Sequence, residues 1–303
     1  MIDDNLRILL LQEMERRNLP DNFLQTIENS YMQVASQIAN AQRSKKGTLL
    51  VSFNGAQGSG KSTITAFLKL ILFEHFDLFT AEVSIDDFYL KRDQRKELSE
   101  SVHPLFITRG VPGTHDVKLA VETIDCLKHC SENNPCKIPA FDKAIDDRLP
   151  VSDWPVIQQK VSIILFEGWC NHAPVQAAEL LSDPINHLER EEDQQVIWRE
   201  YANRQLENYH RLLFSQADML IYLQVPSFEK VYEWRGLQEK KLAFQKQQSP
   251  DLNLRVMDDQ KLARFIQHYE RITRSCLTAL PDSADIVLEL NAEHGIDAVK
   301  YKN

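Results

Sequence analysis

Short apolar runs alternate along the chain with longer stretches in which apolar residues recur every three or four positions. Five runs rich in apolar and β-branched residues are expected to form buried strands: 48–53, 81–85, 161–166, 219–225 and 286–290. Helical patterns lie between several of them. Strands that alternate with helices predict an α/β fold, with a mainly parallel sheet flanked by helices.

The first 45 residues have a helical pattern and contain no glycine. Pro20 divides them into two expected helices, and one face of the second is apolar: Phe23, Ile27, Tyr31, Val34 and Ile38. Such a face has to pack on another element. We therefore expect an N-terminal helical extension over 1–45 that docks on a single larger domain over 46–303.

Two further helical stretches, 186–214 and 228 to about 247, are highly charged. Ser227 is placed to cap the second stretch. Charged helices of this kind are usually solvated faces, but in an enzyme that binds a nucleotide they can also form a lid that closes over the site. Both interpretations stay open on the pattern alone.

Composition excludes several classes of protein. Of the 303 residues, 43% are hydrophobic and 26% charged, which is typical of globular proteins, and the net charge of −9 would repel a nucleic acid backbone. No apolar stretch approaches the roughly 18 residues of a membrane helix, and the N-terminus lacks the basic start of a signal peptide. We therefore expect a cytoplasmic protein with neither a nucleic acid nor a membrane as partner.

The five cysteines include no CxxC pair, so reduced thiols are expected rather than disulfides or a zinc site.

Residues 55–62 read GlyAlaGlnGlySerGlyLysSer and match the phosphate-binding pattern GxxxxGKS between an expected strand and an expected helix. Backbone N–H groups of such a loop face phosphate oxygens, Lys61 would reach the β- and γ-phosphates, and the Ser62 hydroxyl would ligate Mg²⁺. The nucleotide-binding residues predicted here are Gly55, Ala56, Gln57, Gly58, Ser59, Gly60, Lys61, Ser62 and Thr63. An NKxD guanine-reading tetrapeptide is absent from the sequence, which favours ATP.

Carboxylates follow two of the expected strands. Asp86 and Asp87 end the run at 81–85, and Glu167 ends the run at 161–166. Ligands of open α/β sheets bind beyond the carboxyl ends of the strands. Transfer of a phosphoryl group to an alcohol needs one carboxylate at the hydroxyl and another near the metal, so we assign Asp86 to the hydroxyl and Glu167 to Mg²⁺. A turn or a helix cap is the alternative for the aspartates.

With these segments in place, the chain resembles the uridine kinase, phosphoribulokinase and pantothenate kinase superfamily of P-loop small-molecule kinases, and within it the D-glycerate 3-kinase family. The resemblance rests on the phosphate loop, SerIleAspAspPheTyr at 84–89, ArgGlyValProGlyThrHisAsp at 109–116, ProAlaPheAspLys at 139–143, AspAspArg at 146–148, PheGluGlyTrp at 166–169, and ValTyrGluTrpArg at 231–235 with GlnGlu at 238–239. Two segments depart from the plant-type pattern: AlaIleAsp at 144–146 replaces a longer stretch with glycine, and CysAsnHisAlaPro follows Trp169.

The resemblance implies an acceptor pocket and a lid. The acceptor-binding residues it implies are Asp87, Tyr89, Arg109, His115, Asp116, Asp142, Arg148 and Trp169. It also implies a helical lid over about 228–250, from which Arg235 would neutralise charge on the transferred phosphoryl group. The alternatives are surface ion pairs for the arginines, a helix cap for His115 and Asp116, a solvated ion pair for Asp142, a core position for Trp169 and an outer helix face for Arg235.

Glycine is scarce, and seven of the nine glycines fall in these segments: Gly55, Gly58, Gly60, Gly110, Gly113, Gly168 and Gly236. One site served by one sheet favours a single domain. We expect a P-loop kinase with Lys61, Asp86 and Arg235 as catalytic residues, which uses Mg²⁺ and ATP to phosphorylate a small, anionic hydroxy acid, with D-glycerate as the first candidate. Pantothenate or a nucleoside as acceptor, or a regulatory ATPase without an acceptor, are the alternatives. A dimer is compatible with the sequence, although no feature demands one.

Overall fold

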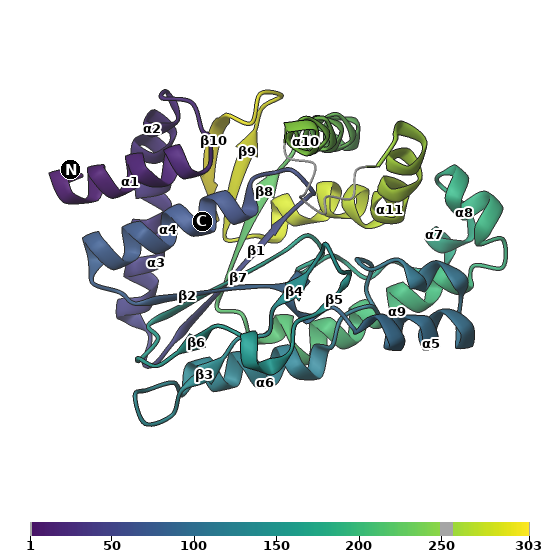
Figure 1. Ribbon diagram of the computed structural model, residues 1–303, viewed down its shortest axis with the longest axis horizontal. Helices are drawn as coiled ribbons and strands as arrows, with labels where there is room; N and C mark the ends of the chain where they lie inside the picture. The colour runs from purple at the N-terminus through teal and green to yellow at the C-terminus, as the bar shows by residue number, and fades with distance from the viewer. Residues whose placement is uncertain (1, 249–256, 303) are drawn as a thin grey trace.

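The computed structural model describes residues 2–248 and 257–302. At its centre lies a six-stranded sheet in the order β10-β9-β8-β1-β7-β2 (Figure 1). The strands are β1 (Leu49–Gly55), β2 (Thr80–Ser84), β7 (Ile163–Gly168), β8 (Met219–Gln224), β9 (Ile286–Leu290) and β10 (Ile296–Tyr301). Neighbouring strands are parallel, except that β10 pairs antiparallel with β9. The mainly parallel α/β sheet expected from the sequence is confirmed.

The five predicted strands are present, and the sequence pattern missed the sixth. The residues of β10 are half-buried or exposed and include Asp297 and Lys300, because this strand forms the edge of the sheet. A strand that buries so little carries no continuous apolar run. The pattern therefore revealed the more buried strands, including β2 at the opposite edge of the sheet, where three of the five residues are buried.

One face of the sheet is covered by the N-terminal helices and by the helix after the phosphate loop. These are α1 (Asp4–Arg16), α2 (Phe23–Thr26), a π-helical turn η1 (Ile27–Tyr31), α3 (Met32–Ser44) and α4 (Lys61–Phe76). Buried residues of α1 and α3 such as Leu10 and Val34 share one apolar core with Val51 and Phe53 of β1. The predicted docking of the first 45 residues is confirmed, while a domain boundary at residue 45 stays a prediction.

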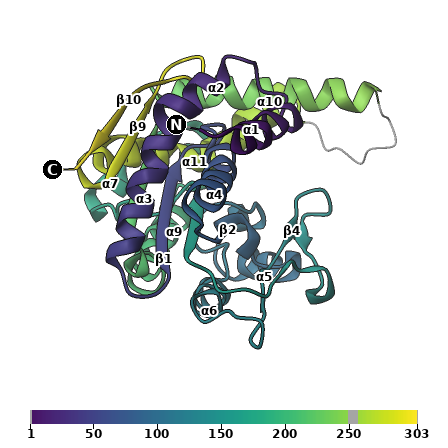
Figure 2. The ribbon, with the colours of Figure 1, turned by 90° about the vertical axis from the view of Figure 1, so that its left-hand side faces the viewer.

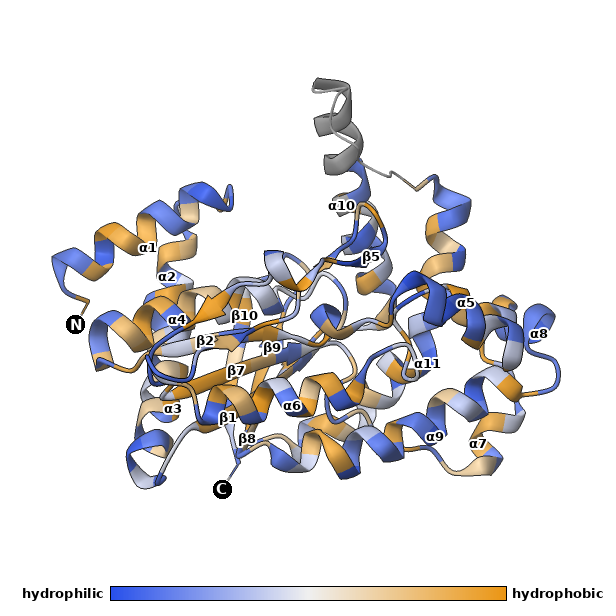
Figure 3. Ribbon diagram, turned by 60° about the horizontal axis from the view of Figure 1, so that its bottom comes forward, coloured by the Kyte–Doolittle hydropathy of each residue, from blue (hydrophilic) through white to orange (hydrophobic). Residues whose placement is uncertain are grey.

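Helices α6 (Val117–Lys128), α9 (Ile197–Leu212) and α11 (Asp259–Ser283) pack over the other face. Side chains along a strand alternate between the two faces. Accordingly Ile163 and Leu165 of β7 join the first core, whereas Ile164 and Phe166 join the second. Figure 3 shows apolar residues along the central strands and hydrophilic ones over α5 and α8. Two apolar cores on either side of one sheet make a three-layer arrangement.

Short elements connect the strand ends to this framework. They are the 3₁₀ turns η2 (Ile85–Phe88), η3 (Pro104–Ile107), η4 (Val151–Asp153) and η5 (Phe214–Gln216), the helices α5 (Arg92–Ser101), α7 (Ala178–Ser182) and α8 (His187–Glu192), and the strand pairs β3 (Cys136–Lys137) with β6 (Val156–Ile157) and β4 (Phe141–Asp142) with β5 (Asp147–Arg148). Most of them lie between β2 and β7 in sequence.

The long helix α10 (Phe228–Gln248) extends away from the sheet, as Figure 2 shows. It coincides with the predicted lid helix, whose last two residues, 249 and 250, lie outside the described residues. The charged stretch at 186–214 forms α8 and α9. All five cysteines are free, and four of them are buried, as expected. Among the described helices, none combines the length and the apolar character needed to cross a membrane.

Candidate active site

A cavity of about 390 Å³ opens at the carboxyl ends of β1, β2 and β7. Its wall comes from the phosphate loop, the ends of two neighbouring strands, the β4–β5 region and helices α10 and α11. The lining residues are Gln57, Gly58, Lys61, Ser62, Ser84, Asp86, Tyr89, Arg109, Lys143, Glu167, Trp169, Arg235, Phe265 and Tyr269. Nine of the predicted site residues, leaving aside the loop's glycines, thus meet in one place: Gln57, Lys61, Ser62, Asp86, Tyr89, Arg109, Glu167, Trp169 and Arg235.

The phosphate loop has the backbone that a phosphate cradle requires. Gly58 and Gly60 have φ of 80° and 89°, a left-handed conformation that side chains other than glycine rarely adopt. Gly60 immediately precedes α4, so the loop leads into a helix N-terminus with its partial positive charge. The hydroxyl of Ser59 is buried and has no hydrogen-bond partner among the residues that the structure describes. Open donors at a helix N-terminus fit a phosphate group.

Lys61 lies beside the loop and donates a hydrogen bond of 3.0 Å from Nζ to the carbonyl oxygen of Ala56. Burial lowers the pKa of Lys61, and the nearby carboxylates of Glu167 and Asp86 counteract that effect. The ammonium group is therefore shielded from bulk water, and its positive charge is stabilised by two nearby carboxylates. A cation held in this position suits the charge of a polyphosphate.

Ser62 and Glu167 come together although they lie on different elements. Ser62 is in the first turn of α4, and Glu167 is in β7, paired in register with Phe53 of β1 and Ser84 of β2. The Ser62 Oγ donates to Glu167 Oε1 over 2.9 Å. Glu167 is buried, which raises its pKa, while Lys61 lowers it. Two oxygen donors this close fit a hard cation such as Mg²⁺ that keeps several waters and binds phosphates.

Asp86 is the central carboxylate on the acceptor side of the cavity. Its Oδ1 accepts a hydrogen bond of 2.6 Å from the Tyr89 hydroxyl, and its Oδ2 accepts one of 2.7 Å from Lys143 Nζ. Burial would raise the pKa of Asp86, but the charge of Lys143 and these hydrogen bonds lower it to about 2. Asp86 is therefore an ionised, doubly held carboxylate at neutral pH.

Arg109, Trp169 and Tyr269 form another part of the cavity wall. Arg109 pairs with the carboxylate of Asp146. Trp169 Nε1 donates to the carbonyl oxygen of Gly110 over 2.9 Å, and its ring meets that of Tyr269 edge to face at 4.8 Å. Trp169 is 4% exposed, so it both belongs to the core and closes the end of the cavity.

Arg235 reaches the cavity from α10. Its guanidinium pairs with Glu239 one turn along the same helix, at 2.5 Å, and Glu239 in turn accepts a hydrogen bond from the Met257 backbone N–H at the start of the segment leading into α11. Arg235 is thus held at the junction of α10 and α11. It lines the same cavity as Gln57, Gly58 and Lys61 of the phosphate loop, and its role as a lid arginine stays a prediction.

Comparison with known proteins identifies the relatives of this chain. A probable ATP-dependent kinase of Saccharomyces cerevisiae is 30% identical over 213 residues, which make up 65% of this chain and 69% of that protein. The chain belongs to this family of ATP-dependent kinases. The chloroplastic D-glycerate 3-kinase of Arabidopsis thaliana is 32% identical over 194 residues, 62% of this kinase. This match spans only 40% of the length of the Arabidopsis protein. No protein-family model matches the chain.

A solved structure shares the fold. The D-glycerate 3-kinase of Cryptococcus neoformans superposes with a TM-score of 0.70 at 23% identity, over 89% of this kinase and 99% of that chain. The predicted resemblance to D-glycerate 3-kinase and related P-loop kinases is confirmed, and with it the P-loop kinase fold. Use of ATP and of a small-molecule substrate follows from membership of the family.

Five of the predicted acceptor-binding residues of this kinase do not line the cavity: Asp87, His115, Asp116, Asp142 and Arg148. Asp87 caps the 3₁₀ turn η2 by accepting from the Ser84 backbone N–H over 3.1 Å. Asp116 caps α6 by accepting from the Leu119 N–H over 3.1 Å. For both aspartates the cap considered as an alternative is present.

The other three residues support the cavity from behind. His115 stacks on Tyr89 at 4.7 Å and its Nδ1 lies 3.0 Å from the Tyr209 hydroxyl. Arg148 donates from Nη2 to the Tyr89 carbonyl oxygen over 2.8 Å and pairs with Asp116. Asp142 accepts from the Ala144 N–H at the start of the β4–β5 turn. Direct contact of these residues with an acceptor stays a prediction.

Four residues of the cavity wall were missing from the predicted site: Ser84, Lys143, Phe265 and Tyr269. Lys143 lies in the ProAlaPheAspLys motif beside the predicted Asp142, so its motif was noticed and its role was not. Phe265 and Tyr269 come from α11, which no sequence prediction covered. The apolar residues Leu262, Ile266, Tyr269 and Cys276 recur on one side of α11, and this pattern was the available signal.

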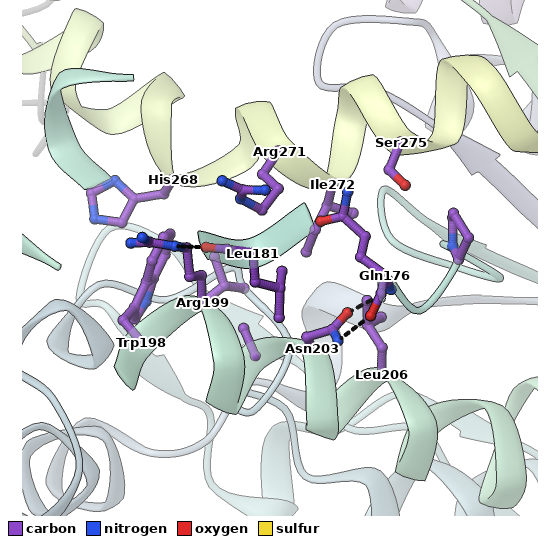
Figure 4. Close-up of a pocket in the computed structure, with 13 residues that line it drawn as sticks. Gln176, Leu181, Trp198, Arg199, Asn203, Leu206, His268, Arg271, Ile272 and Ser275 are labelled. Atoms are coloured by element: carbon purple, nitrogen blue, oxygen red, sulfur yellow. Dashed lines mark hydrogen bonds between the residues drawn. The ribbon is translucent and has the colours of Figure 1, made fainter. Parts of the chain in front are cut away.

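A second cavity lies between α9 and α11 (Figure 4). It has a volume of about 20 Å³, room for roughly one water molecule. Arg199 and Arg271 stand in its wall, but Arg199 is paired with Asp193 and donates to the Leu181 carbonyl oxygen, while Arg271 is paired with Glu189. Its wall contains no carboxylate and no part of the phosphate loop, unlike the wall of the larger cavity.

Proposed function

We propose that this kinase transfers the γ-phosphoryl group of ATP to a hydroxyl of a small anionic hydroxy acid, with D-glycerate as the first candidate. One observation carries the proposal: the phosphate loop, the Ser62–Glu167 pair and the Asp86–Lys143 pair face the same cavity, which Arg109 also lines. Phosphates and an acceptor hydroxyl can therefore meet in one place. The names of two relatives, both D-glycerate 3-kinases, support the choice of acceptor.

The phosphate end of the site binds and orients ATP. The loop residues 55–63 surround the phosphates, and Lys61 neutralises their charge. Ser62 and Glu167 would hold Mg²⁺, which when bound screens the negative charge of the β- and γ-phosphates. Arg235 would complete the enclosure from α10 and stabilise charge that develops on the transferred group.

The acceptor end orients a hydroxyl toward the γ-phosphorus. Asp86 accepts the hydroxyl hydrogen bond, and Lys143 and Tyr89 keep its carboxylate in one orientation. With a pKa of about 2, Asp86 is a weak base. Phosphoryl transfer has a loose transition state, in which the attacking hydroxyl becomes acidic only late in the reaction. Orienting the hydroxyl toward the γ-phosphorus therefore matters more than removing its proton early. The new bond between the acceptor oxygen and the γ-phosphorus forms as the bond from that phosphorus to the bridging oxygen breaks, ADP leaves with that oxygen, and the hydroxyl proton passes to a carboxylate oxygen of Asp86.

Arg109 is the cavity residue best suited to the carboxylate of a hydroxy acid, because a guanidinium binds a carboxylate in a fork of parallel hydrogen bonds. Trp169 and Tyr269 close the wall beside it. The cavity of about 390 Å³ has to hold the phosphates of ATP as well as the acceptor, which supports a small acceptor over a bulky one.

The test is an ADP-release assay with Mg·ATP and a panel of acceptors: D-glycerate, L-glycerate, pantothenate and a nucleoside. Wild-type protein should turn over D-glycerate well above the rate with water. Lys61→Ala and Asp86→Asn should each lower kcat by at least about a hundredfold. A nucleoside or pantothenate as the best acceptor would replace D-glycerate within the same chemistry. Equal ADP release with and without every acceptor, unchanged in Asp86→Asn, would support a regulatory ATPase instead.

The oligomeric state, the cytoplasmic location and the expected lack of nucleic acid and membrane partners stay predictions. Sedimentation of the purified protein with and without Mg·ATP would decide between a monomer and the dimer that the sequence is compatible with.

A further inference from the structure

Arg109, which lines the cavity, belongs to a network of two arginines and one carboxylate. The carboxylate of Asp146 lies between two guanidinium groups: its Oδ1 pairs with Arg109 Nη1, and its Oδ2 pairs with Arg95 Nη2 at 3.1 Å. Among the described residues, Nη1 is the only donor of Arg109 with a hydrogen-bond partner. Asp146 therefore holds one edge of the Arg109 guanidinium and leaves its remaining donors for the cavity.

Arg95 is the fixed part of this network. It lies on α5 and its side chain is 1% exposed. The guanidinium donates to three carbonyl oxygens from three segments: Leu90 at 3.2 Å, Ile107 at 2.9 Å and Asp146 at 2.7 Å. A buried cation is tolerated only when it is paired and hydrogen-bonded. Arg95 thus ties the Asp146 turn to the segment that leads into Arg109.

The backbone places Asp146 by a conformation that is unusual for its type. Its φ is 60°, in the left-handed region that glycine adopts most readily. The turn between β4 and β5 that contains it sets both arginines over the Phe141 ring, with Arg109 at 5.5 Å and Arg95 at 5.9 Å from the ring centroid. The carboxylate is thereby held between the two cations by the fold rather than by a freely rotating surface side chain.

The charges on the acceptor side of the cavity can be counted from these pairs. Lys143 and Asp86 neutralise each other. Arg95, Asp146 and Arg109 together carry one net positive charge, and that charge is presented by Arg109. A site with one net positive charge and a few free guanidinium donors suits an acceptor with one negative charge, and a second negative charge would meet the Asp146 carboxylate.

We propose that Asp146 and Arg95 are positioning residues that aim Arg109 into the cavity and restrict the acceptor to a monoanion. The inference rests on the proposed function, because it gives Arg109 the role of binding the acceptor's carboxylate. It adds a specificity determinant outside the cavity wall and a substrate class: hydroxy acids with a single carboxylate, in preference to dicarboxylates or phosphorylated acceptors.

The test measures binding by calorimetry in the presence of Mg·ADP, with D-glycerate as a monoanion and tartronate as a dianion of nearly the same size. Wild-type protein should bind D-glycerate more tightly. Asp146→Asn removes the carboxylate charge and keeps a hydrogen-bond acceptor, so it should shift the affinity ratio toward tartronate by roughly fivefold to tenfold. Affinity for Mg·ADP should change less than twofold.

Asp147→Asn is the matched control. It makes the same change one residue further along, where the side chain accepts from the Arg92 and Arg148 backbone N–H groups and touches neither Arg95 nor Arg109. Its affinity ratio should equal that of the wild type. A wild type that binds tartronate as tightly as D-glycerate, a wild type that binds neither, or a ratio that Asp146→Asn leaves unchanged would each overturn the inference.

A second variant separates the orientation of Arg109 from the net charge of the network. Arg95→Lys keeps the positive charge but cannot donate to all three carbonyl oxygens, so D-glycerate affinity should fall about tenfold while the preference over tartronate persists. An unchanged D-glycerate affinity would contradict the positioning role. If the variant lacks a cooperative melting transition, Asp146→Asn alone decides.

Turnover distinguishes this inference from the proposed function. Selective binding of D-glycerate without any phosphorylated product would remove the proposed function and leave the charge restriction standing. Phosphorylation of D-glycerate with an affinity ratio that does not respond to Asp146→Asn would do the reverse.

Discussion

The hydroxyl of Ser62 and the carboxylate of Glu167 lie 2.9 Å apart although 105 positions separate them in the sequence. The contact exists because β1 and β7 are parallel neighbours, so the loop after β1 and the end of β7 share one edge of the sheet. Ser62 lies in the first turn of the helix that leaves this edge, and Glu167 lies near the end of β7, the neighbouring strand in the sheet. The pair is the geometric basis for placing Mg²⁺ in this kinase.

This pair predicts the metal dependence of the enzyme. Ser62→Ala should raise the Mg²⁺ concentration needed for half-maximal turnover by about tenfold or more, because one oxygen donor is lost while the fold is kept. Glu167→Gln should do the same. The measurement is turnover against free Mg²⁺ at saturating ATP. Ser101→Ala, at an exposed serine of α5 whose hydroxyl donates to the Glu97 carbonyl oxygen, is the control, and a Mg²⁺ dependence shared by all three variants would contradict the assignment.

Gly110 predicts a steric effect on stability. A Cβ at this position would lie 2.2 Å from the Tyr269 hydroxyl oxygen, and φ is +131°. Gly110→Ala should therefore strain the backbone and displace Tyr269 from the cavity wall, at a cost of roughly 2–4 kcal/mol in the free energy of unfolding. Urea unfolding followed by tryptophan fluorescence measures this cost.

Gly47→Ala is the control for Gly110→Ala. Gly47 also has a positive φ, +101°, but a Cβ there would meet no atom within 4 Å. This variant should lose only about 1 kcal/mol, which represents the backbone strain alone. Equal losses in the two variants would show that the contact with Tyr269 is unimportant.

The buried strands, and the residues that follow them, could be predicted from the sequence. A strand that is buried on both faces has a continuous run of apolar residues. Asp86 and Glu167 were found in this way. Lys143 was missed as a partner of Asp86, since a hairpin 57 positions away brings it there and no local pattern encodes that approach. Asp146 and Arg95 were missed for the same reason. Their proposed role depends on their contacts with each other and with Arg109, and these contacts are not encoded in any local sequence pattern.

The cap residues show a different limit. Asp116 was assigned both to an acceptor and to a helix cap, and the pattern of an acidic residue before a helix fits either role. The structure shows the cap, and it also shows that Arg148 occupies the second carboxylate oxygen. Residue type and spacing define what a side chain can do, whereas its partners come from tertiary contacts.

Asp87 predicts how stability depends on pH. Burial and the nearby carboxylates of Asp86 and Glu167 raise the pKa of Asp87 to about 7, against 3.8 for an exposed aspartate. Between these values the folded protein holds a proton that the unfolded chain has released, so stability is highest at the acid end and falls as pH rises toward 7. The effect is the reverse of that of a salt-bridged aspartate.

Asp87→Asn should remove this dependence, because asparagine can still accept from the Ser84 N–H and does not ionise. Melting temperatures of the nucleotide-free protein at pH 5.5 and pH 8 provide the measurement. The wild type should lose about 2–4 °C more than the variant over this range. The same change at exposed Asp21 should leave the wild-type slope, and an Asp87→Asn protein with the wild-type slope would show that Asp87 is ionised throughout.

Lys143 predicts the pH profile of catalysis. Its ammonium group lies 2.7 Å from Asp86 Oδ2 and is the main cause of the low pKa of that carboxylate. Asp86 has to be ionised to accept the hydroxyl proton, and with a pKa of about 2 it is ionised at any pH well above that value. In Lys143→Gln the burial of Asp86 is no longer opposed by this charge, so the pKa of Asp86 should rise.

An acid limb should therefore appear in the plot of kcat/KM against pH for Lys143→Gln, with activity falling as pH drops through about 5, whereas the wild type should show no such limb from Asp86. Lys137→Gln, at an exposed lysine of β3 that contacts only the Val151 carbonyl oxygen among the described residues, is the matched control and should keep the wild-type profile. If Lys143→Gln lowers activity by the same factor at every pH, Lys143 acts on the phosphates or the acceptor directly. If it has no effect, the Asp86–Lys143 pair is not part of the reacting site.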